Sequence, residues 1–184
     1  MAFPDVVANA LCLELVNTVN NWYEPTGDAL ADPAAAASWA ALVGAPLDAE
    51  PHAQALTRAR ALRVCVHDMF RSVAHGRRPT AGDLGGLGQI YATALRTARL
   101  APTGSTYEFV WPSGGELDDL LVRAAASAVE LLTDGPLDRV GECPSCGWLF
   151  LDTSRNGRRR WCSMETCGAR VKARRHYAAR TGTT

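Results

Sequence analysis

Two close pairs of cysteines near the C-terminus constrain the fold of this 184-residue chain more than any other feature. The members of the first pair are separated by two residues and those of the second by four, with fifteen residues between the pairs. Thiolates at such spacings suit the tetrahedral coordination of one Zn²⁺ ion. The four predicted ligands are Cys143, Cys146, Cys162 and Cys167.

Two disulfides in a secreted domain are the alternative to a metal site. No apolar signal segment opens the chain, and the other cysteines, Cys12 and Cys65, stand alone in apolar runs. We therefore expect a reducing compartment, the cytoplasm, in which paired thiols favour a metal. Four sulfur ligands fill the tetrahedral shell and leave no position for an activated water, so the predicted zinc is structural.

The segments between and after the cysteines predict a small finger. Gly147 allows the chain to reverse beneath the metal, and residues 148–152 form an apolar strand. Asn-Gly at 156–157 marks a turn, after which residues 158–162 are expected to return as a second strand. Ser163 suits the N-cap of a helix over residues 164–180. A knuckle, a hairpin and a helix in this order predict a treble-clef-like finger.

Short motifs in this region resemble those of the CGNR-type zinc finger. They lie at residues 143–150, 152–156, 159–164 and 167–170. The Asn that gives the family its name is replaced here by Ala169, whereas the cysteines are retained. Such fingers usually follow an ABATE domain, in proteins regarded as stress-induced transcription regulators, and residues 11–18 resemble the opening motif of that domain.

The resemblance implies a mainly α (α+β) fold in two domains. Residues 1–136 would form a helical ABATE-like domain with a short β-hairpin, and residues 137–184 the zinc finger, with the boundary at a Gly-Pro break. It further implies a transcription regulator whose helical domain senses a ligand or forms a homodimer and whose finger binds DNA. A protein-interaction module and an RNA-binding protein remain as alternatives. No catalytic constellation or nucleotide fingerprint is present in the sequence, so we expect no enzymatic activity.

The charge distribution supports a polyanion partner for the finger. The net formal charge of the whole chain is zero. The segment from Arg139 onward contains ten Lys/Arg and three Asp/Glu, whereas the residues before it contain nine Lys/Arg and sixteen Asp/Glu. Clustered arginines can pair with phosphates or with guanine edges. The candidate nucleic-acid contacts are Arg155, Arg158, Arg159, Arg160, Arg170, Lys172 and Arg175.

The rest of the chain is patterned for helices. Apolar residues at helical spacing predict helices over residues 6–19, 33–43, 48–74, 81–95 and 117–132, and two short apolar strands predict a hairpin over residues 98–111. Asp32 and Thr80 are the expected N-caps of the second and fourth of these helices. The arginines of the long third helix are expected on a solvated face, together with the isolated His67 and His75. No apolar run is long enough to cross a membrane.

Two polar residues on the first predicted helix, Glu14 and Asn17, interrupt an apolar face. They could line a pocket for a small-molecule ligand. Alternatively, and more commonly for such residues, they bond the backbone of a neighbouring loop.

Overall fold

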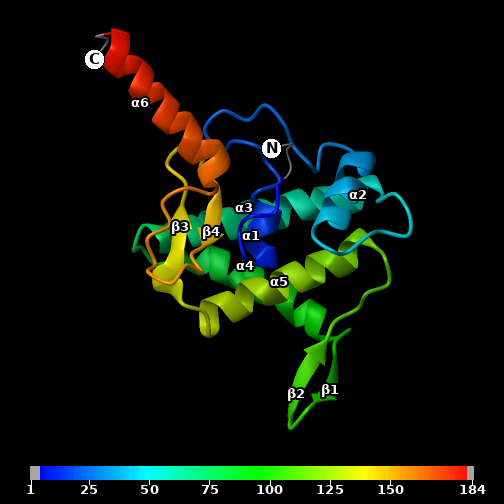
Figure 1. Ribbon diagram of the computed structural model, residues 1–184. Coiled ribbons are helices and arrows are strands. Elements are labelled where there is room, and N and C mark those ends of the chain that lie inside the picture. The colour runs from blue at the N-terminus through cyan, green and yellow to red at the C-terminus, as the bar shows by residue number, and fades with distance from the viewer. Residues whose placement is uncertain (1–4, 182–184) are drawn as a thin grey trace.

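A computed structural model describes residues 5–181. A mostly helical N-terminal region with a projecting hairpin is followed by a small region that carries the four cysteines, as predicted (Figure 1). None of the helices in the described part is long and apolar enough to span a lipid bilayer. The elements are α1 (Leu11–Val16), α2 (Pro33–Leu42), α3 (Ala53–Ala74), α4 (Ala81–Leu95), β1 (Arg99–Thr103), β2 (Thr106–Val110), α5 (Leu117–Thr133), the 3-10 turn η1 (Leu137–Arg139), β3 (Val140–Glu142), β4 (Leu149–Leu151), the π-helical turn η2 (Met164–Gly168) and α6 (Ala169–Thr181).

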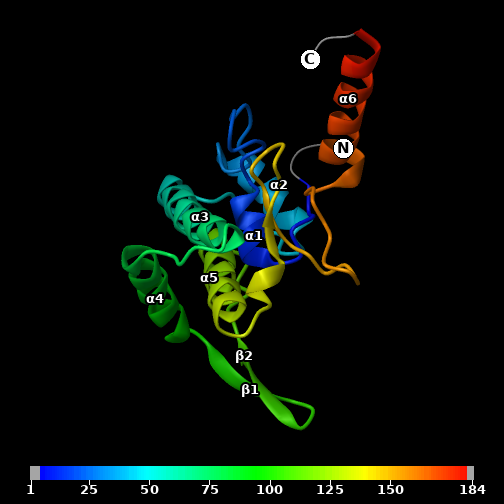
Figure 2. The ribbon, with the colours of Figure 1, turned by 90° about the vertical axis from the view of Figure 1, so that its left-hand side faces the viewer.

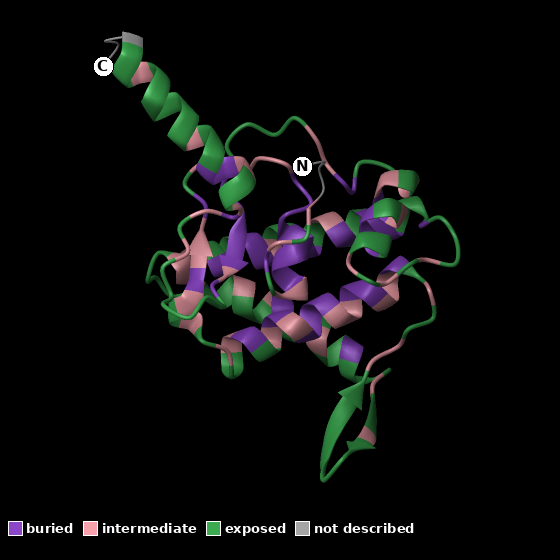
Figure 3. Ribbon diagram, in the orientation of Figure 1, coloured by how far each residue is buried: buried purple, intermediate pink, exposed green. Residues whose placement is uncertain are grey.

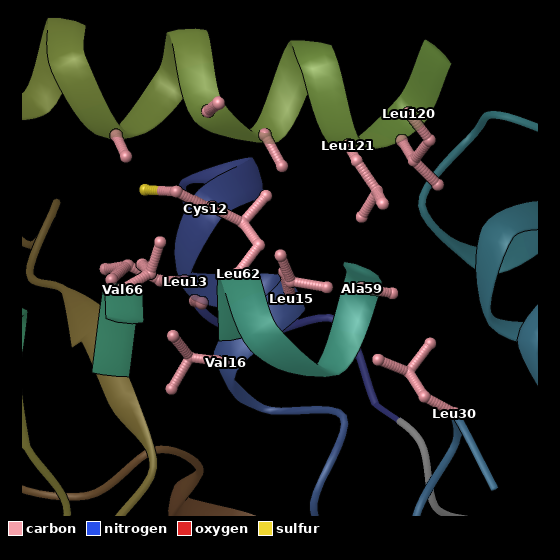
Figure 4. Close-up of a cluster of buried hydrophobic side chains, with 14 of the residues drawn as sticks. Cys12, Leu13, Leu15, Val16, Leu30, Ala59, Leu62, Val66, Leu120 and Leu121 are labelled. Atoms are coloured by element: carbon pink, nitrogen blue, oxygen red, sulfur yellow. The ribbon is translucent and has the colours of Figure 1, made fainter. Parts of the chain in front are cut away.

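The short helix α1 lies at the centre of the core. From Cys12 to Val16 its side chains are buried, with α5 on one side and α3 on the other, as Figure 4 shows for Leu13 and Leu15. Leu62 of α3 and Leu121 of α5 meet them there. Figure 3 shows that burial concentrates on these three helices, whereas the β1–β2 hairpin and α6 are almost wholly exposed.

Capping determines where several helices begin. Asp32 and Thr80 cap α2 and α4 through their side chains, as the sequence predicts. The predicted start of α3 at residue 48 is wrong, because His52 accepts the amide of Ala55 and starts the helix at Ala53. The prediction that α1 begins at residue 6 is also wrong, since Asn9 adopts φ +62° and interrupts the helical path.

The Glu14 side chain explains the shape of the chain before α1. Its carboxylate accepts hydrogen bonds from the amides of Ala8 (2.6 Å) and Val7 (3.4 Å), and it is buried. The carboxylate thus holds an extended segment against the helix that follows. Burial raises the pKa of Glu14 to about 7, although the two amides act in the opposite direction.

The finger contains a strand pair different from the predicted one. Strand β4 pairs antiparallel with β3, which precedes the knuckle, with Gly141 opposite Phe150. The predicted return strand over residues 158–162 is wrong, because this segment runs as an irregular loop. The order of knuckle and helix is nevertheless the expected one.

The edge of β4 that faces away from β3 already has hydrogen-bonding partners, so no second strand pairs there. The Asn17 side chain donates to the carbonyl of Leu149 (2.9 Å) and accepts from its amide (3.0 Å), as a neighbouring strand would. Two residues on, the amide of Leu151 donates to Ala8 O (2.8 Å) and its carbonyl accepts from Asn9 Nδ2 (2.9 Å). Since these groups of β4 already have partners, the 158–162 segment has no edge on which to pair.

Glu14 and Asn17 therefore have structural roles. They hydrogen-bond backbone groups, which was the alternative to lining a ligand pocket. Both side chains are buried and their polar atoms bond backbone groups, so we place no ligand there. Instead, Asn17 joins α1 to the finger. The two regions also share one hydrophobic core, because Val140 of β3 and Leu149 of β4 pack with the helices.

We predict that Asn17→Ala lowers the free energy of unfolding by about 3 kcal/mol, because it leaves a buried amide and a buried carbonyl of Leu149 unpaired. Urea denaturation followed by circular dichroism measures the change. Asn20→Ala is the control, since the Asn20 side chain bonds Thr26 at an exposed site. Equal stability of the two variants would contradict the role given to Asn17.

We also predict a pH-dependent effect of Glu14→Gln. The folded-state pKa of Glu14 lies above its usual value of 4.5, so the stability it contributes is complete below about pH 4.5 and is lost as the pH rises towards 7. The amide variant cannot ionise. The free energy of unfolding of Glu14→Gln relative to the wild type should therefore increase between these pH values, and a constant difference across a pH series of denaturation curves would contradict the prediction.

Candidate metal centre

The four predicted cysteines meet in one buried cluster. Their sulfur atoms all lie within 4.8 Å of one another, and the Sγ atoms of Cys146 and Cys162 are 3.6 Å apart. Sulfurs at about 2.3 Å from a tetrahedral Zn²⁺ ion would be separated by roughly 3.8 Å. All the cysteines are free thiols, and a disulfide would need a separation of about 2.05 Å. The donor set therefore fits one zinc ion.

The knuckle between β3 and β4 positions the first two ligands. The amide of Cys143 donates to Trp148 O (2.8 Å), and the amide of Gly147 donates to Cys143 O (2.9 Å), which closes the turn. Gly147 has φ +74°, and a Cβ at this position would lie 2.8 Å from that of Trp22. The turn thus requires glycine both for its backbone conformation and for its close approach to the helical region.

The last ligand comes from the helical turn that follows the loop. Ser163 accepts the amide of Thr166 and caps η2, as the sequence predicts for this residue. Cys167 lies in η2, a π-helical turn that passes directly into α6. The metal cluster therefore anchors the base of α6.

Ionisation of all four cysteine thiols requires a positive charge among them. Hydrogen bonds from Cys146, Cys162 and Cys167 lower the pKa of the Cys143 thiol, whereas interaction with Cys143 and burial raise that of Cys162. Four neighbouring thiols cannot all ionise without a positive charge between them. A divalent ion supplies that charge, and a closed shell of four thiolates makes its role structural.

Comparison with known protein families agrees with this geometry. The model of the ABATE family, described as "Putative stress-induced transcription regulator", matches residues 9–135, and the CGNR zinc finger model matches residues 139–180. The chain belongs to the ABATE family. No curated protein matches it.

Arg159 has a structural position beside the zinc ligands of this ABATE-family protein. Its guanidinium stacks on the Phe150 ring at 4.4 Å and donates to the carbonyls of Val7 (2.6 Å), Trp161 (3.0 Å) and Cys162. Its amide donates to Asp152 Oδ2 (2.8 Å). The guanidinium is thus used to hold the loop, so we omit Arg159 from the proposed nucleic-acid surface.

The other predicted contact residues are exposed. Arg155, Arg158 and Arg160 lie on the loop after β4, where they line a hollow of about 670 Å³ together with Trp161. Arg160 stacks on Trp161, with its Cζ 5.3 Å from the ring. The remaining candidates lie on α6; they are Arg170, Lys172 and Arg175. Figure 2 shows the loop, in orange, and α6 on the same side of the molecule.

Sequence reasoning missed a polar cluster where the finger meets α3. Glu142 accepts hydrogen bonds from Tyr23 Oη (3.0 Å) and Arg71 Nε (3.3 Å) and bonds His75 Nε2 (2.5 Å). Although burial opposes ionisation, the bonds from His75 and Tyr23 and the charge of Arg71 lower the pKa of Glu142. These partners are distant in sequence, and no local pattern relates them.

We predict that Cys167→Ser abolishes stoichiometric zinc binding, because the site loses one of its four sulfur ligands. Cys12→Ser is the matched control, since Cys12 is equally buried but lies in α1, outside the cluster. Elemental analysis of protein prepared without chelator measures the zinc content. Zinc retained by the Cys167 variant, or absent from the wild type, would contradict the assignment.

Proposed function

We propose that this ABATE-family protein regulates transcription by binding DNA through the exposed cations of its zinc finger. The main support is helix α6. Five Lys/Arg and no acidic residue occur in its 13 residues, and it projects away from the helical body (Figure 1). Those cations are Arg170, Lys172, Arg174, Arg175 and Arg180.

The surface of α6 suits a binding element better than a packing element. Only Val171 and Ala178 are partly covered among its side chains up to residue 180, and the packing of α6 within the chain is chiefly against η2. A helix that is polar around most of its circumference gains little from a core. Its length, about 20 Å, and its width suit the major groove of B-form DNA.

One row on α6 supports this proposal further. Lys172, His176 and Arg180 recur every four residues and border a shallow hollow of about 700 Å³ with Tyr177. Ala169, which stands where the family motif has Asn, borders the same hollow. The position of the family Asn would thus face the same partner as the cations.

The loop supplies a second set of charges. The loop after β4, which carries Arg155, Arg158 and Arg160, lies on the side of the molecule from which α6 projects (Figure 2). A duplex that received α6 could therefore also meet this loop through its phosphates. DNA is the favoured polyanion, because the major groove of A-form RNA is too narrow and deep for a helix.

We predict that Lys172→Ala combined with Arg175→Ala weakens duplex DNA binding and reduces the slope of log affinity against log salt by about two, one unit for each phosphate that the variant no longer neutralises. Arg78→Ala is the control, because Arg78 is exposed between α3 and α4, outside the finger. Fluorescence anisotropy over a salt series, with zinc-loaded full-length protein, measures both quantities.

The same titrations separate DNA from other partners. The proposal requires that duplex DNA competes better than double-stranded RNA or an acidic peptide of equal charge. Failure to bind any duplex at low salt, or an equal loss in the Arg78 control, would contradict it.

A further inference from the structure

The β1–β2 hairpin exposes an apolar face that the described chain does not cover. Cross-strand partners share a face, so Leu100 lies beside Phe109 and Pro102 beside Tyr107 on one side of the hairpin. The exposed fractions are 66% for Leu100, 75% for Tyr107 and 44% for Phe109. The hairpin extends from the body between α4 and α5 (Figure 1). A two-stranded hairpin with an uncovered apolar face is marginally stable alone, which points to a partner.

The size of this face is that of an interaction site. With roughly 200 Å² for a large side chain, the exposed parts of Leu100, Tyr107 and Phe109 amount to about 400 Å² of apolar surface on each copy. That is the size of the largest apolar patch on a typical monomer, which is often functional. Two copies joined edge to edge would place these faces side by side on one surface of a single sheet, where Tyr107 and Phe109 of each copy cover part of those of the other.

The register of the hairpin distinguishes its two edges. Hydrogen-bonded and non-hydrogen-bonded pairs alternate in an antiparallel ladder, and Pro102 has no amide hydrogen to give to Tyr107. The Pro102–Tyr107 and Leu100–Phe109 pairs are therefore the non-hydrogen-bonded ones. It follows that the backbone groups of these residues point outward, away from the partner strand.

The outer edge of β1 is blocked and that of β2 is open. On β1, Pro102 removes one outward donor, a common protection against edge pairing. On β2, Tyr107 and Phe109 each direct one amide and one carbonyl outward. When a second β2 strand lies antiparallel to the first, the outward amide and carbonyl of Tyr107 can pair with those of Phe109 in the other copy, and the reverse.

We propose that the hairpin is a dimerisation arm in which β2 pairs antiparallel with β2 of a second copy. Tyr107 of each copy then lies opposite Phe109 of the other, with two backbone hydrogen bonds in each pair and one aromatic cross-strand contact. The result is a four-stranded sheet with the order β1-β2-β2-β1. A twofold axis between the two Glu108 residues relates the copies, as in most homodimers.

Proline substitutions at cross-strand positions test the choice of edge. Phe109→Pro removes an outward donor from β2, whereas Leu100→Pro removes the equivalent donor from the opposite edge, and neither interrupts the ladder inside the hairpin. Phe109→Pro should weaken dimerisation by about tenfold or more, because each dimer forms two fewer intermolecular hydrogen bonds. Leu100→Pro, the matched control, should dimerise more tightly than Phe109→Pro. Sedimentation equilibrium of the zinc-loaded full-length chain measures the dissociation constants.

A third variant tests the register. The proposed pairing places the two Glu108 side chains opposite each other, and like charges so placed destabilise a sheet. Glu108→Gln should therefore tighten the dimer several-fold, and unchanged or weaker association would overturn the register. A wild-type chain that stays monomeric at all concentrations, or equal weakening by Phe109→Pro and Leu100→Pro, would overturn the arm itself. Nucleic acid is absent from these measurements, so their outcome is independent of DNA binding.

Discussion

Strand β4 has hydrogen-bonding partners on both edges, and the placement of the finger depends on this. On one edge it pairs with β3, and on the other it meets the side chains of Asn17 and Asn9 and the carbonyl of Ala8. A three-residue strand could not hold its place alone. Because α1 supplies Asn17 from the centre of the core, the finger has a fixed orientation relative to the helices.

Zinc and this junction stabilise different parts of the finger. The junction fixes β4, but the loop and η2 have few apolar side chains to bury, and a second small cluster forms around the cysteines with Trp148 and Phe150. Binding of zinc can contribute roughly 10 kcal/mol to the folding of such a small unit. Arg159 extends the effect, because it links the loop to the N-terminal segment through Val7 O. The metal therefore completes a structure that the helical region has only partly fixed.

Local patterns predicted the features that local chemistry determines. The cysteine spacing, the helix caps at Asp32 and Thr80 and the existence of the β1–β2 hairpin follow from neighbouring residues alone. The β3–β4 pairing could not be predicted, because the competing edge of β4 is filled by Asn17, 132 residues away from Leu149.

Partners that are distant in sequence also determine where two polar side chains of α3 lie. The prediction that Arg63 lies on a solvated face is wrong, because Arg63 is buried and pairs with Asp28 at 2.5 Å. His67 is also buried, and it stacks on Trp22 with the ring centroids 3.7 Å apart. In both cases the partner comes from the loop after α1. An amphipathic pattern identifies the face of a helix but not the loop that later covers part of it.

Helix α6 packs chiefly against the adjoining turn η2, and the repulsion between its cations acts against its formation. Arg170 and Arg174 are four residues apart, and like charges at this spacing destabilise a helix by a few tenths of a kcal/mol. A polyanion bound along α6 would neutralise that repulsion, so binding and helix stability would be linked by mass action. Added salt would then have two opposing effects, because it screens the repulsion within α6 and weakens attraction to phosphates. Since Cys167 anchors only the base of the helix, the linkage would be strongest towards Arg180, where the metal contributes least.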